Sequence, residues 1–405
     1  MLKEDILSEK KWLEYLQYKI DKDFLTKKDL KELSDFILNK KYIDIAKKIT
    51  ENQYNFSTAK KHIINKGASR KKRIVYTYSK EEMIILKYIS FLLYKYDYLF
   101  SHNLYSFRKN RSVKTAIKNI SNIKNISNMY GYKVDIQNYF NSIDINILLN
   151  NLKKDIDDKL LYSIFSQLLL NNTVIYNKKE IIEQKGVMAG TPISAFLANY
   201  YIKEIDEYFW NKKIVYFRYA DDIIIFCNTK EELNFAIQTL QNYISKYNLK
   251  INKDKEYFFN PKDKWDFLGF SYENNNIDLS SNSVKKIKSK IRRSARSFRR
   301  WMIKKNVQPE ITIKTMIKRY NQKFYGNDKD SELSWKYWFF PTITTTKSLK
   351  IIDEHMQKYL RYIYTGKHNK RNYKIVPYDT LKFLGYKPLV HEYYKLKSFN
   401  MEDNM

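Results

Sequence analysis

Residues 214–227 read IVYFRYADDIIIFC, in which Ala220-Asp221-Asp222 separates two apolar runs. Runs of β-branched and aromatic residues on both sides of a short break are typical of a β-hairpin. We therefore predict strands over 214–219 and 223–227, with both carboxylates presented at the tip. Adjacent acids often serve only to form a turn, because Asp readily accepts hydrogen bonds from nearby backbone amides. The rest of the chain decides between a simple turn and a reactive site.

A second acidic position lies in a short apolar strand pattern upstream. This is Asp135, in the run YKVDI over residues 132–136. An unpaired carboxylate beside buried strands is costly to desolvate, and hard divalent cations with oxygen ligands offset that cost. Carboxylates from two strands can hold two Mg²⁺ ions about 3.5–4 Å apart, which stabilise the attacking and leaving oxygens of a phosphoryl transfer. Asp135, Asp221 and Asp222 together therefore predict a catalytic site for two magnesium ions.

Helical and strand patterns alternate along the chain as far as residue 280. Apolar residues at helical spacing predict helices in five regions. These are residues 1–60, 80–100, 144–170, 193–210 and 230–247. Another strand pattern covers 173–176, and the basic, glycine-containing segment 66–73 predicts a loop. Beyond 280 the chain reads as helical, basic and aromatic. Strands interleaved with helices predict an α+β lobe.

The composition excludes several classes of protein. With 43% hydrophobic and 16% aromatic residues, the 405-residue chain is not a disordered polypeptide, and its length predicts two or three lobes. Its single cysteine, Cys227, excludes a disulfide scaffold and a multi-cysteine zinc site, and five histidines argue against a histidine metal site. The first residues lack the apolar core of a signal peptide, and charges interrupt the longest apolar runs. We expect a soluble, cytoplasmic protein that does not enter membranes.

The net charge of +31, from 75 Lys and Arg against 44 Asp and Glu, creates a strong positive field. The commonest partner of such a field is a polyanion. A compositional bias explains many of the lysines, but not the deficit of acids or the clustered arginines. An anionic membrane surface is the weaker alternative, because no basic stretch carries a clean amphipathic anchor. We predict that nucleic acid binds the cluster formed by Arg292, Arg293, Arg296, Arg299 and Arg300.

The hairpin motif Tyr219-Ala220-Asp221-Asp222 resembles the Tyr-x-Asp-Asp box of reverse transcriptases. Five further segments, in the right order, are similar to motifs of that family. They are NLYSFR at 103–108 with Arg111-Ser112 for the fingers, DIQNYF at 135–140 for the first palm motif, GTPISAFLAN at 190–199 for the following palm helix, LKINKDK at 249–255 for the palm lysine, and FLGF at 267–270 for the primer grip.

The resemblance implies a role for each matching residue. Asp135 and Asp221 would ligate both Mg²⁺ ions. The Ile136 carbonyl would be a further ligand, with Asp222 in support. Phe140 would exclude a 2′-hydroxyl and so favour deoxynucleotides, unless it is an ordinary core aromatic. The residues implied to contact the nucleotide or the nucleic acid are Lys71, Arg73, Gly190, Lys255, Arg108 and Arg111. Lys255 would support the departing pyrophosphate as a proton donor or a charge. A solvated surface position is the alternative for the cations among them.

Two departures from the family pattern concern the choice of substrate. Many relatives carry Gln-Gly where this chain has Ala189-Gly190, and Ser-Pro where it has Ser194-Ala195. In those relatives the Gln helps to shape the nucleotide site. Its replacement here leaves the fidelity of synthesis and the use of a template open, but phosphoryl transfer is still expected. The C-terminal region resembles that of the bacterial "unknown-group", defence-associated reverse transcriptases. Residues typical of an intron nuclease or of retron enzymes are absent from the sequence.

The resemblance implies an α+β right-hand polymerase fold, with an antiparallel palm sheet flanked by helices. We expect an N-terminal helical extension over 1–60, fingers and palm over 61–270, and a basic helical thumb and C-terminal region over 271–405. The implied function is RNA-directed DNA synthesis from dNTPs on an RNA template, in antiphage defence with a noncoding RNA. Untemplated or protein-primed DNA synthesis is one alternative, and a non-catalytic RNA-binding scaffold is another. The sequence leaves open whether the protein forms a homo-oligomer and whether it binds a partner protein.

Overall fold

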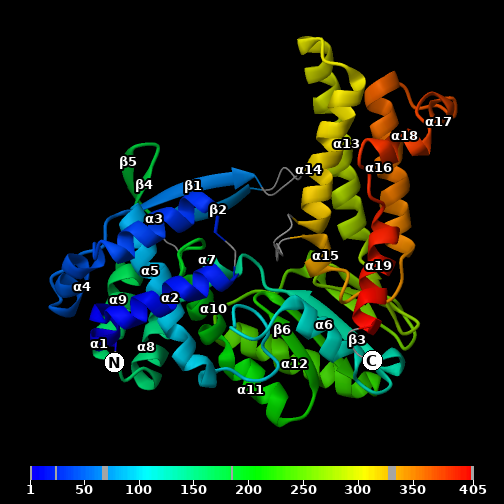
Figure 1. Cartoon of the computed structure of the whole chain (residues 1–405). Coiled ribbons are helices and arrows are strands. Elements are labelled where there is room, and N and C mark those ends of the chain that lie inside the picture. The colour runs from blue at the N-terminus through cyan, green and yellow to red at the C-terminus, as the bar shows by residue number, and fades with distance from the viewer. Residues whose placement is uncertain (1, 23–24, 66–71, 184–185, 327–333, 403–405) are drawn as a thin grey trace. The chain divides into compact units, whose positions relative to one another are not determined.

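The computed structural model describes residues 2–22, 25–65, 72–183, 186–326 and 334–402. Contacts between backbone positions divide the chain into two compact units, whose helices and strands are labelled in Figure 1. Unit 1 comprises residues 1–119 and 123–261, and unit 2 comprises residues 120–122 and 262–405. Each unit has its own β-structure and its own helices.

The first sheet of unit 1 is antiparallel and has the strand order β6–β7–β3–β8. Its strands are β6 (Val215–Tyr219), β7 (Asp222–Cys227), β3 (Tyr130–Asp135) and β8 (Tyr257–Phe259). The hairpin prediction is therefore confirmed. Residues Ile223–Phe226 of the central strand are at most 1% exposed, as an uninterrupted apolar run indicates for a strand covered on both faces. The covering helices α11 (Lys203–Asn211) and α12 (Lys230–Lys246) contact β6 and β7.

The second sheet of unit 1 has the strand order β2–β1–β4–β5, in which only the β1–β4 pair is parallel. Its strands are β1 (Ala59–Asn65), β2 (Lys72–Thr77), β4 (Thr173–Tyr176) and β5 (Lys179–Ile182). Of these, the sequence predicts only β4. The expected loop over 66–73 is wrong for Lys72 and Arg73, which begin β2; residues 66–71 lie outside the described residues. Strand β2 lies at the edge of the sheet, and edge strands often carry charged side chains. Lys72 and Arg73 therefore obscure the alternation by which a strand is recognised in the sequence.

Four short helices fill the first 50 residues, as the helical spacing predicts. They are α1 (Leu2–Leu7), α2 (Glu9–Lys22), α3 (Lys27–Leu38) and α4 (Tyr42–Thr50). They share a core with α5 (Lys80–Leu92), since the ring of Trp12 stacks on that of Tyr88 with 3.7 Å between centroids. Both side chains are fully buried. The N-terminal helices therefore belong to the hydrophobic core of unit 1.

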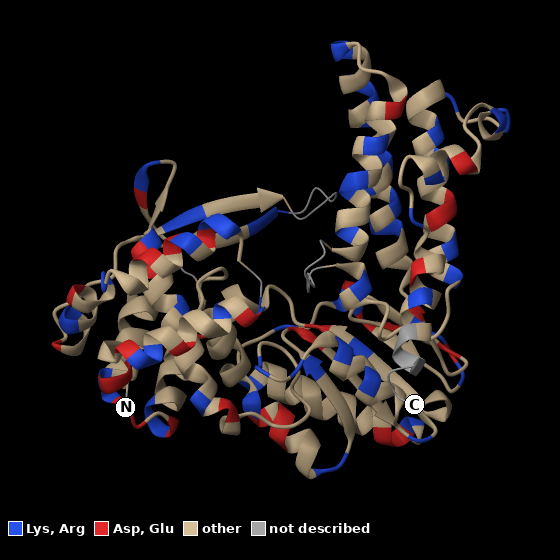
Figure 2. Cartoon of the chain, in the orientation of Figure 1, with Lys and Arg blue, Asp and Glu red and all other residues tan. Residues whose placement is uncertain are grey.

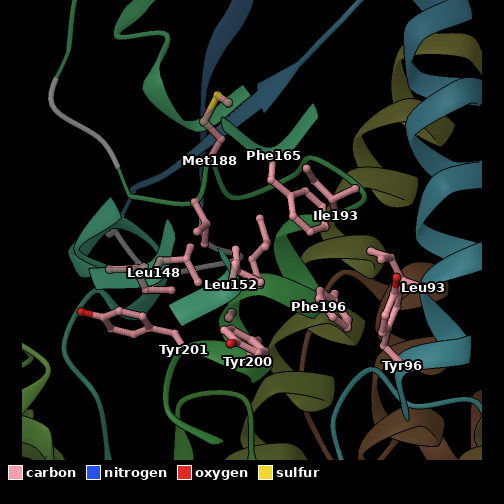
Figure 3. Close-up of a cluster of buried hydrophobic side chains, with 14 of the residues drawn as sticks. Leu93, Tyr96, Leu148, Leu152, Phe165, Met188, Ile193, Phe196, Tyr200 and Tyr201 are labelled. Atoms are coloured by element: carbon pink, nitrogen blue, oxygen red, sulfur yellow. The ribbon is translucent and has the colours of Figure 1, made fainter. Parts of the chain in front are cut away.

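Further helices begin in unit 1, and several of them pack around the cluster of large apolar side chains that Figure 3 shows. They are η1 (Leu93–Leu99), α6 (Val113–Ser121), η2 (Ile126–Asn128), α7 (Tyr139–Ser142), α8 (Ile145–Asp155), α9 (Lys159–Leu170), α10 (Ser194–Tyr201) and η3 (Lys253–Lys255). The helical stretch predicted over 144–170 contains two helices, α8 and α9. The reason is a second N-cap, because Asp158 accepts a hydrogen bond from the Leu161 amide and starts α9.

Unit 2 combines a small antiparallel sheet with long helices. Its strands, in the order β11–β10–β9, are β9 (Trp265–Phe267), β10 (Phe270–Glu273) and β11 (Asn276–Leu279). Its helices are α13 (Ser281–Lys305), α14 (Pro309–Tyr325), α15 (Trp335–Trp338), α16 (Lys347–Thr365), α17 (Asn372–Ile375), α18 (Tyr378–Phe383) and α19 (Leu389–Glu402). Helices α13, α14 and α16 contact one another, as Figure 1 shows. The helical character beyond residue 280 is confirmed for the described residues.

Basic side chains line the helices of unit 2, as the blue segments of α13 and α14 show in Figure 2. Helix α13 has no Asp or Glu among its 25 residues. Its apolar positions Ile287, Ile291, Ala295 and Met302 are buried, so the cations occupy the remaining faces. Within the described part of the chain, no helix is both long enough and apolar enough to cross a bilayer.

Candidate active site

The three predicted catalytic carboxylates lie at adjacent strand ends. Asp135, the last residue of β3, pairs in register with Asp222, the first residue of β7. Residues directly opposite on antiparallel strands project to the same face, with Cβ atoms about 4.5–5.5 Å apart. The carbonyl of Asp221 accepts a 3.0 Å hydrogen bond from the Ile136 amide. The structure thus brings together the backbones of three acids from two distant segments.

The pKa of Asp222 reflects the proximity of the other two acids. Burial raises the pKa of Asp222 to about 6, and the negative charges of Asp221 and Asp135 act in the same direction. The cations Lys133 and Lys255 oppose the shift. Mutually repelling carboxylates are stabilised by a bound cation, and their oxygens are the ligands that hard divalent cations prefer. The donor set therefore fits Mg²⁺.

Two side chains from the segment after α12 hold Asp135. The Lys255 ammonium donates a hydrogen bond to Oδ2, and Asn252 Nδ2 donates to Oδ1 at 2.8 Å. Partial burial lowers the pKa of Lys255, but the hydrogen bond to Asp135 and the charge of its carboxylate raise it above its ordinary value. Among the described residues, no three Asp, Glu, His or Cys side chains already form a metal-binding shell. A cation that binds Asp135 therefore competes with Lys255.

The turn that carries Asp221 is built by a buried polar network, which the sequence motifs do not reveal. Ala220 has a left-handed backbone with φ +56°, which is uncommon for a residue other than glycine. Its amide donates to Ser106 Oγ at 2.8 Å, and its carbonyl accepts from Arg218 Nη1 at 3.2 Å. Ser106 in turn donates to Asn199 Oδ1. An arginine inside an apolar strand pattern is the signal that could have identified this network.

Phe140, the expected steric gate, lies in helix α7 just after the end of β3. Its ring meets Phe107 edge-on at 6.4 Å, and Phe107 contacts Tyr219 at the end of β6 at 6.3 Å. The Phe140 carbonyl accepts a hydrogen bond from the Val187 amide. A Cβ at Gly186 would lie 2.1 Å from that carbonyl oxygen. Only glycine therefore lets the loop of residues 186–190 pack against Phe140.

The same loop anchors strand β2. Gly190 has φ +106°, and a Cβ there would lie 3.1 Å from the Tyr76 carbonyl oxygen. The Tyr76 amide donates to the Ala189 carbonyl at 2.9 Å. Arg73 is exposed and lies in the edge strand β2. The strand that contains Arg73 is therefore fixed to the loop that contains Gly190. Lys71 lies outside the described residues.

Both of the arginines expected in the fingers donate hydrogen bonds to backbone carbonyls. Arg108 forms two 2.7 Å bonds to the Asp97 carboxylate and donates to the Ser101 carbonyl, and its side chain is 6% exposed. Arg111 donates to the His102 carbonyl at 2.7 Å and lies over the Tyr105 ring. The Arg108 guanidinium is therefore engaged inside the protein, and its contact with nucleic acid stays a prediction.

The basic cluster of helix α13 lies in unit 2, and its members differ in environment. Arg292 is exposed and lines a groove of about 600 Å³ between α13 and α16, together with Lys285 and Lys288. Arg299 is instead half-buried, and donates to the Ile363 carbonyl at 2.8 Å. The exposed members of the cluster are Arg292, Arg293, Arg296 and Arg300. These four can offer charge to a polyanion, whereas Arg299 secures the end of α16.

A protein-family model described as "Reverse transcriptase (RNA-dependent DNA polymerase)" matches residues 60–272, which is more than half of the chain. The putative COX1/OXI3 intron 2 protein of Saccharomyces cerevisiae (strain ATCC 204508 / S288c) is 27% identical over 176 residues, or 43% of this chain and 20% of that protein. The Retron Ec83 reverse transcriptase of Escherichia coli is 28% identical over 161 residues, or 37% of this chain and 50% of that protein. The chain thus spans half or less of the length of these relatives.

Among solved structures, apo telomerase from Candida tropicalis is similar to this chain, with 14% sequence identity and a TM-score of 0.47. The match covers 84% of this chain and 69% of the telomerase chain. Telomerase from Candida albicans, solved in complex with a fragment of telomeric RNA, has 12% identity and a TM-score of 0.46. That match covers 86% of this chain and 68% of the other.

Proposed function

The chain belongs to the reverse transcriptase (RNA-dependent DNA polymerase) family, and we propose from that premise that it adds deoxynucleotides to a DNA strand on an RNA template. Its α+β architecture is the right-hand polymerase fold that the motifs predict, with the sheet β6–β7–β3–β8 as the palm. The observation that carries the proposal is the register of Asp135 opposite Asp222, with Asp221 hydrogen-bonded to Ile136.

Asp135 and Asp221 would hold two Mg²⁺ ions, with Asp222 and the Ile136 carbonyl in support. Such ions, when bound, supply the charge that stabilises the attacking and leaving oxygens of phosphoryl transfer. The placement of Lys255 on Asp135 supports a role for its ammonium at the departing pyrophosphate, as a proton donor or as a neutralising charge.

Residues around the palm would select and orient the nucleotide. The Phe140 ring would exclude a ribose 2′-hydroxyl. The close packing of Gly186 on the Phe140 backbone supports a fixed position for that residue. Gly190 would shape the nucleotide site, since it lets strand β2 approach the loop. Arg73 on β2, with Lys71, would neutralise the incoming triphosphate.

Replacing Asp221 with Asn tests the assignment of the carboxylates. The change keeps the size of the side chain but removes its charge, so we expect incorporation of labelled dNTPs on a primed RNA template to be abolished. RNA binding should persist, as measured by filter retention. Asp157→Asn, at an exposed acid before α9, is the matched control and should retain activity. Incorporation by Asp221→Asn at the wild-type rate would refute the metal site.

The nature of the product separates templated from untemplated or protein-primed synthesis. A copied RNA yields complementary DNA, whereas untemplated addition yields a tract of low sequence complexity. Sequencing the product of the purified protein distinguishes these outcomes, and a product that resists extraction from protein would indicate priming from a side-chain hydroxyl. If no primer–template pair supports any incorporation, the RNA-binding scaffold is the better description.

The biological setting is a further part of the proposal. The C-terminal resemblance supports a cytoplasmic role in bacterial antiphage defence, and the charge of +31 supports a dedicated RNA partner. The exposed arginines of α13 would bind that RNA. Purifying the protein from its host and sequencing the bound RNA and DNA tests this directly. The mass of the native complex would show whether a second copy or another protein is present.

A further inference from the structure

A pocket of about 420 Å³ lies in unit 1 beside the outer edge of the palm sheet. Its walls come from the segment 102–105, from the end of helix α11 and from strand β6. Strand β6 is an edge strand, so the pocket opens beside the sheet. None of the three catalytic carboxylates lines it. The volume is within the range of about 300–1,000 Å³ that holds small ligands.

Aromatic rings dominate the walls. Tyr105 and Phe217 stack with 5.4 Å between centroids and an interplanar angle of 27°. On another wall, Trp210 and His102 lie 5.1 Å apart. Trp210 is 51% exposed, an unusual position for so large an apolar ring. Flat aromatic walls with an exposed indole favour a planar ligand, because rings stack on rings.

A buried amide side chain forms part of one wall of the pocket. Asn103 is 5% exposed, and its Nδ2 donates to the Asp206 carbonyl at 2.8 Å. Its Oδ1 is buried and accepts no hydrogen bond from the described residues. Because this oxygen has almost no accessible surface, it offers no acceptor to a ligand in the pocket, and recognition depends on the rings and the charge of the lining.

The charge at the pocket is positive. Lys213 is an exposed lining residue, and no Asp or Glu lines the pocket. Arg111 reinforces the wall, because it donates to the His102 carbonyl and lies over the Tyr105 ring. A ligand with an anionic group next to its planar ring is therefore favoured over a neutral one.

We propose that this pocket binds a nucleobase, with the base stacked on the exposed ring of Trp210 beside His102 and its attached phosphate at Lys213. The ligand is either a mononucleotide or an unpaired base of a bound RNA strand, since both present the same chemistry. The site goes beyond the proposed polymerase function and does not depend on it, because it uses none of the carboxylates.

The test measures binding in EDTA, so that no divalent ion assists nucleotide binding at the carboxylates. In one arm, AMP, GMP, CMP and UMP are titrated into the full-length protein by calorimetry, with inorganic phosphate and the unphosphorylated nucleosides for comparison. In the other arm, a single-stranded RNA that carries 4-thiouridine is photocrosslinked, and the modified peptide is mapped. Trp210→Ala and Lys213→Glu are the test variants. The matched controls are Trp301→Ala, a 43% exposed indole in α13, and Lys212→Glu, the exposed neighbour of Lys213.

We expect a ligand that carries a nucleobase to bind in at least one arm. If RNA binds, the crosslink should map to residues 102–105 or 210–217. Trp210→Ala should weaken binding about tenfold, because it removes a stacking surface, and Lys213→Glu should weaken the phosphorylated ligands more than the nucleosides. If the mononucleotides bind, the ligand is a free nucleotide. If only the RNA binds, the ligand is an unpaired base of an RNA strand. The proposal is overturned if neither arm shows binding, if phosphate alone binds as well, or if the controls lose as much affinity as the test variants.

Discussion

Arg218 and Asp206 form a fully buried ion pair next to the turn that carries Asp221. Nε of Arg218 lies 2.7 Å from Oδ1 and Nη2 lies 2.5 Å from Oδ2, and both side chains are 0% exposed. Burial lowers the pKa of Arg218, but the charge and hydrogen bonds of Asp206 raise it above its ordinary value, so the guanidinium stays charged. Because Nη1 also reaches the Ala220 carbonyl, the pair connects helix α11 to the turn.

Removing one partner of this pair should be strongly destabilising. Arg218→Met leaves the Asp206 carboxylate buried without its cation, which costs about 3–5 kcal/mol. We expect a corresponding loss in the free energy of unfolding, measured by urea denaturation. The control is Lys246→Met, which breaks the pair with Glu204 at 2.8 Å, where the side chains are 59% and 45% exposed. That change should cost about 1 kcal/mol or less. Equal costs for the two variants would mean that Arg218 does not hold the turn.

Replacing Lys255 with Gln should affect catalysis far more than folding. The Lys255 side chain is 46% exposed, so loss of its contact with Asp135 should change the free energy of unfolding by about 1 kcal/mol or less. If its ammonium supports the leaving group, the rate of single-nucleotide incorporation should fall about a hundredfold. Lys253→Gln, at an exposed lysine in the same short helix η3, should leave the rate within about twofold of wild type. Similar rates for the two variants would assign Lys255 to the solvated surface.

Gly186→Ala tests the packing beneath the proposed steric gate. The new Cβ would lie 2.1 Å from the Phe140 carbonyl oxygen, so backbone must shift. Overpacking of this kind costs about 1–3 kcal/mol. Because the shift moves Phe140, we also expect weaker discrimination between dNTPs and rNTPs, measured as the ratio of kcat/KM values. A destabilised variant with unchanged discrimination would show that Phe140 is only a core residue.

Two arginines of one helix should respond differently to the same change. Arg292→Gln removes an exposed charge, so we expect a lower affinity for RNA. The plot of log affinity against log salt concentration should become less steep by about one unit, because about one counterion fewer is released on binding. Arg299→Gln removes the hydrogen bond to the Ile363 carbonyl and should lower the free energy of unfolding by about 1–3 kcal/mol. The salt slope of Arg299→Gln should equal that of wild type. Reversed behaviour would mean that the exposed face of α13 turns away from nucleic acid.

Part of this structure could be predicted because local pattern and tertiary environment agree. The run Ile223–Phe226 is apolar throughout, and the structure buries it in the centre of a sheet. The break at Ala220–Asp222 marks the turn, since only a turn separates the two strands. Helices α12 and α13 follow equally clear signals. Thr229 forms a capping box with Glu232, and the apolar residues of α13 recur at helical spacing.

Other parts could not be predicted because their pattern is too short or is masked by charge. Strands β8 to β11 have three or four residues each, too few for an alternation to be recognised. Strand β2 begins with Lys72 and Arg73 and reads as a loop. The pairing of Arg108 with Asp97 is likewise not visible in the sequence pattern. Such pairings depend on distance in space, which spacing in the sequence does not encode.

The sequence by itself determined that this chain carries three carboxylates on strand-forming segments, an excess of positive charge, and the motifs of a polymerase family. These properties are local or additive, so they can be counted along the chain. Only the tertiary structure decided that Asp135 faces Asp222, that Lys255 contacts Asp135, and that Trp210 and Lys213 line one aromatic pocket with segment 102–105. Those relationships arise when strands and loops far apart in the sequence pack into one core, where burial and register determine which groups meet.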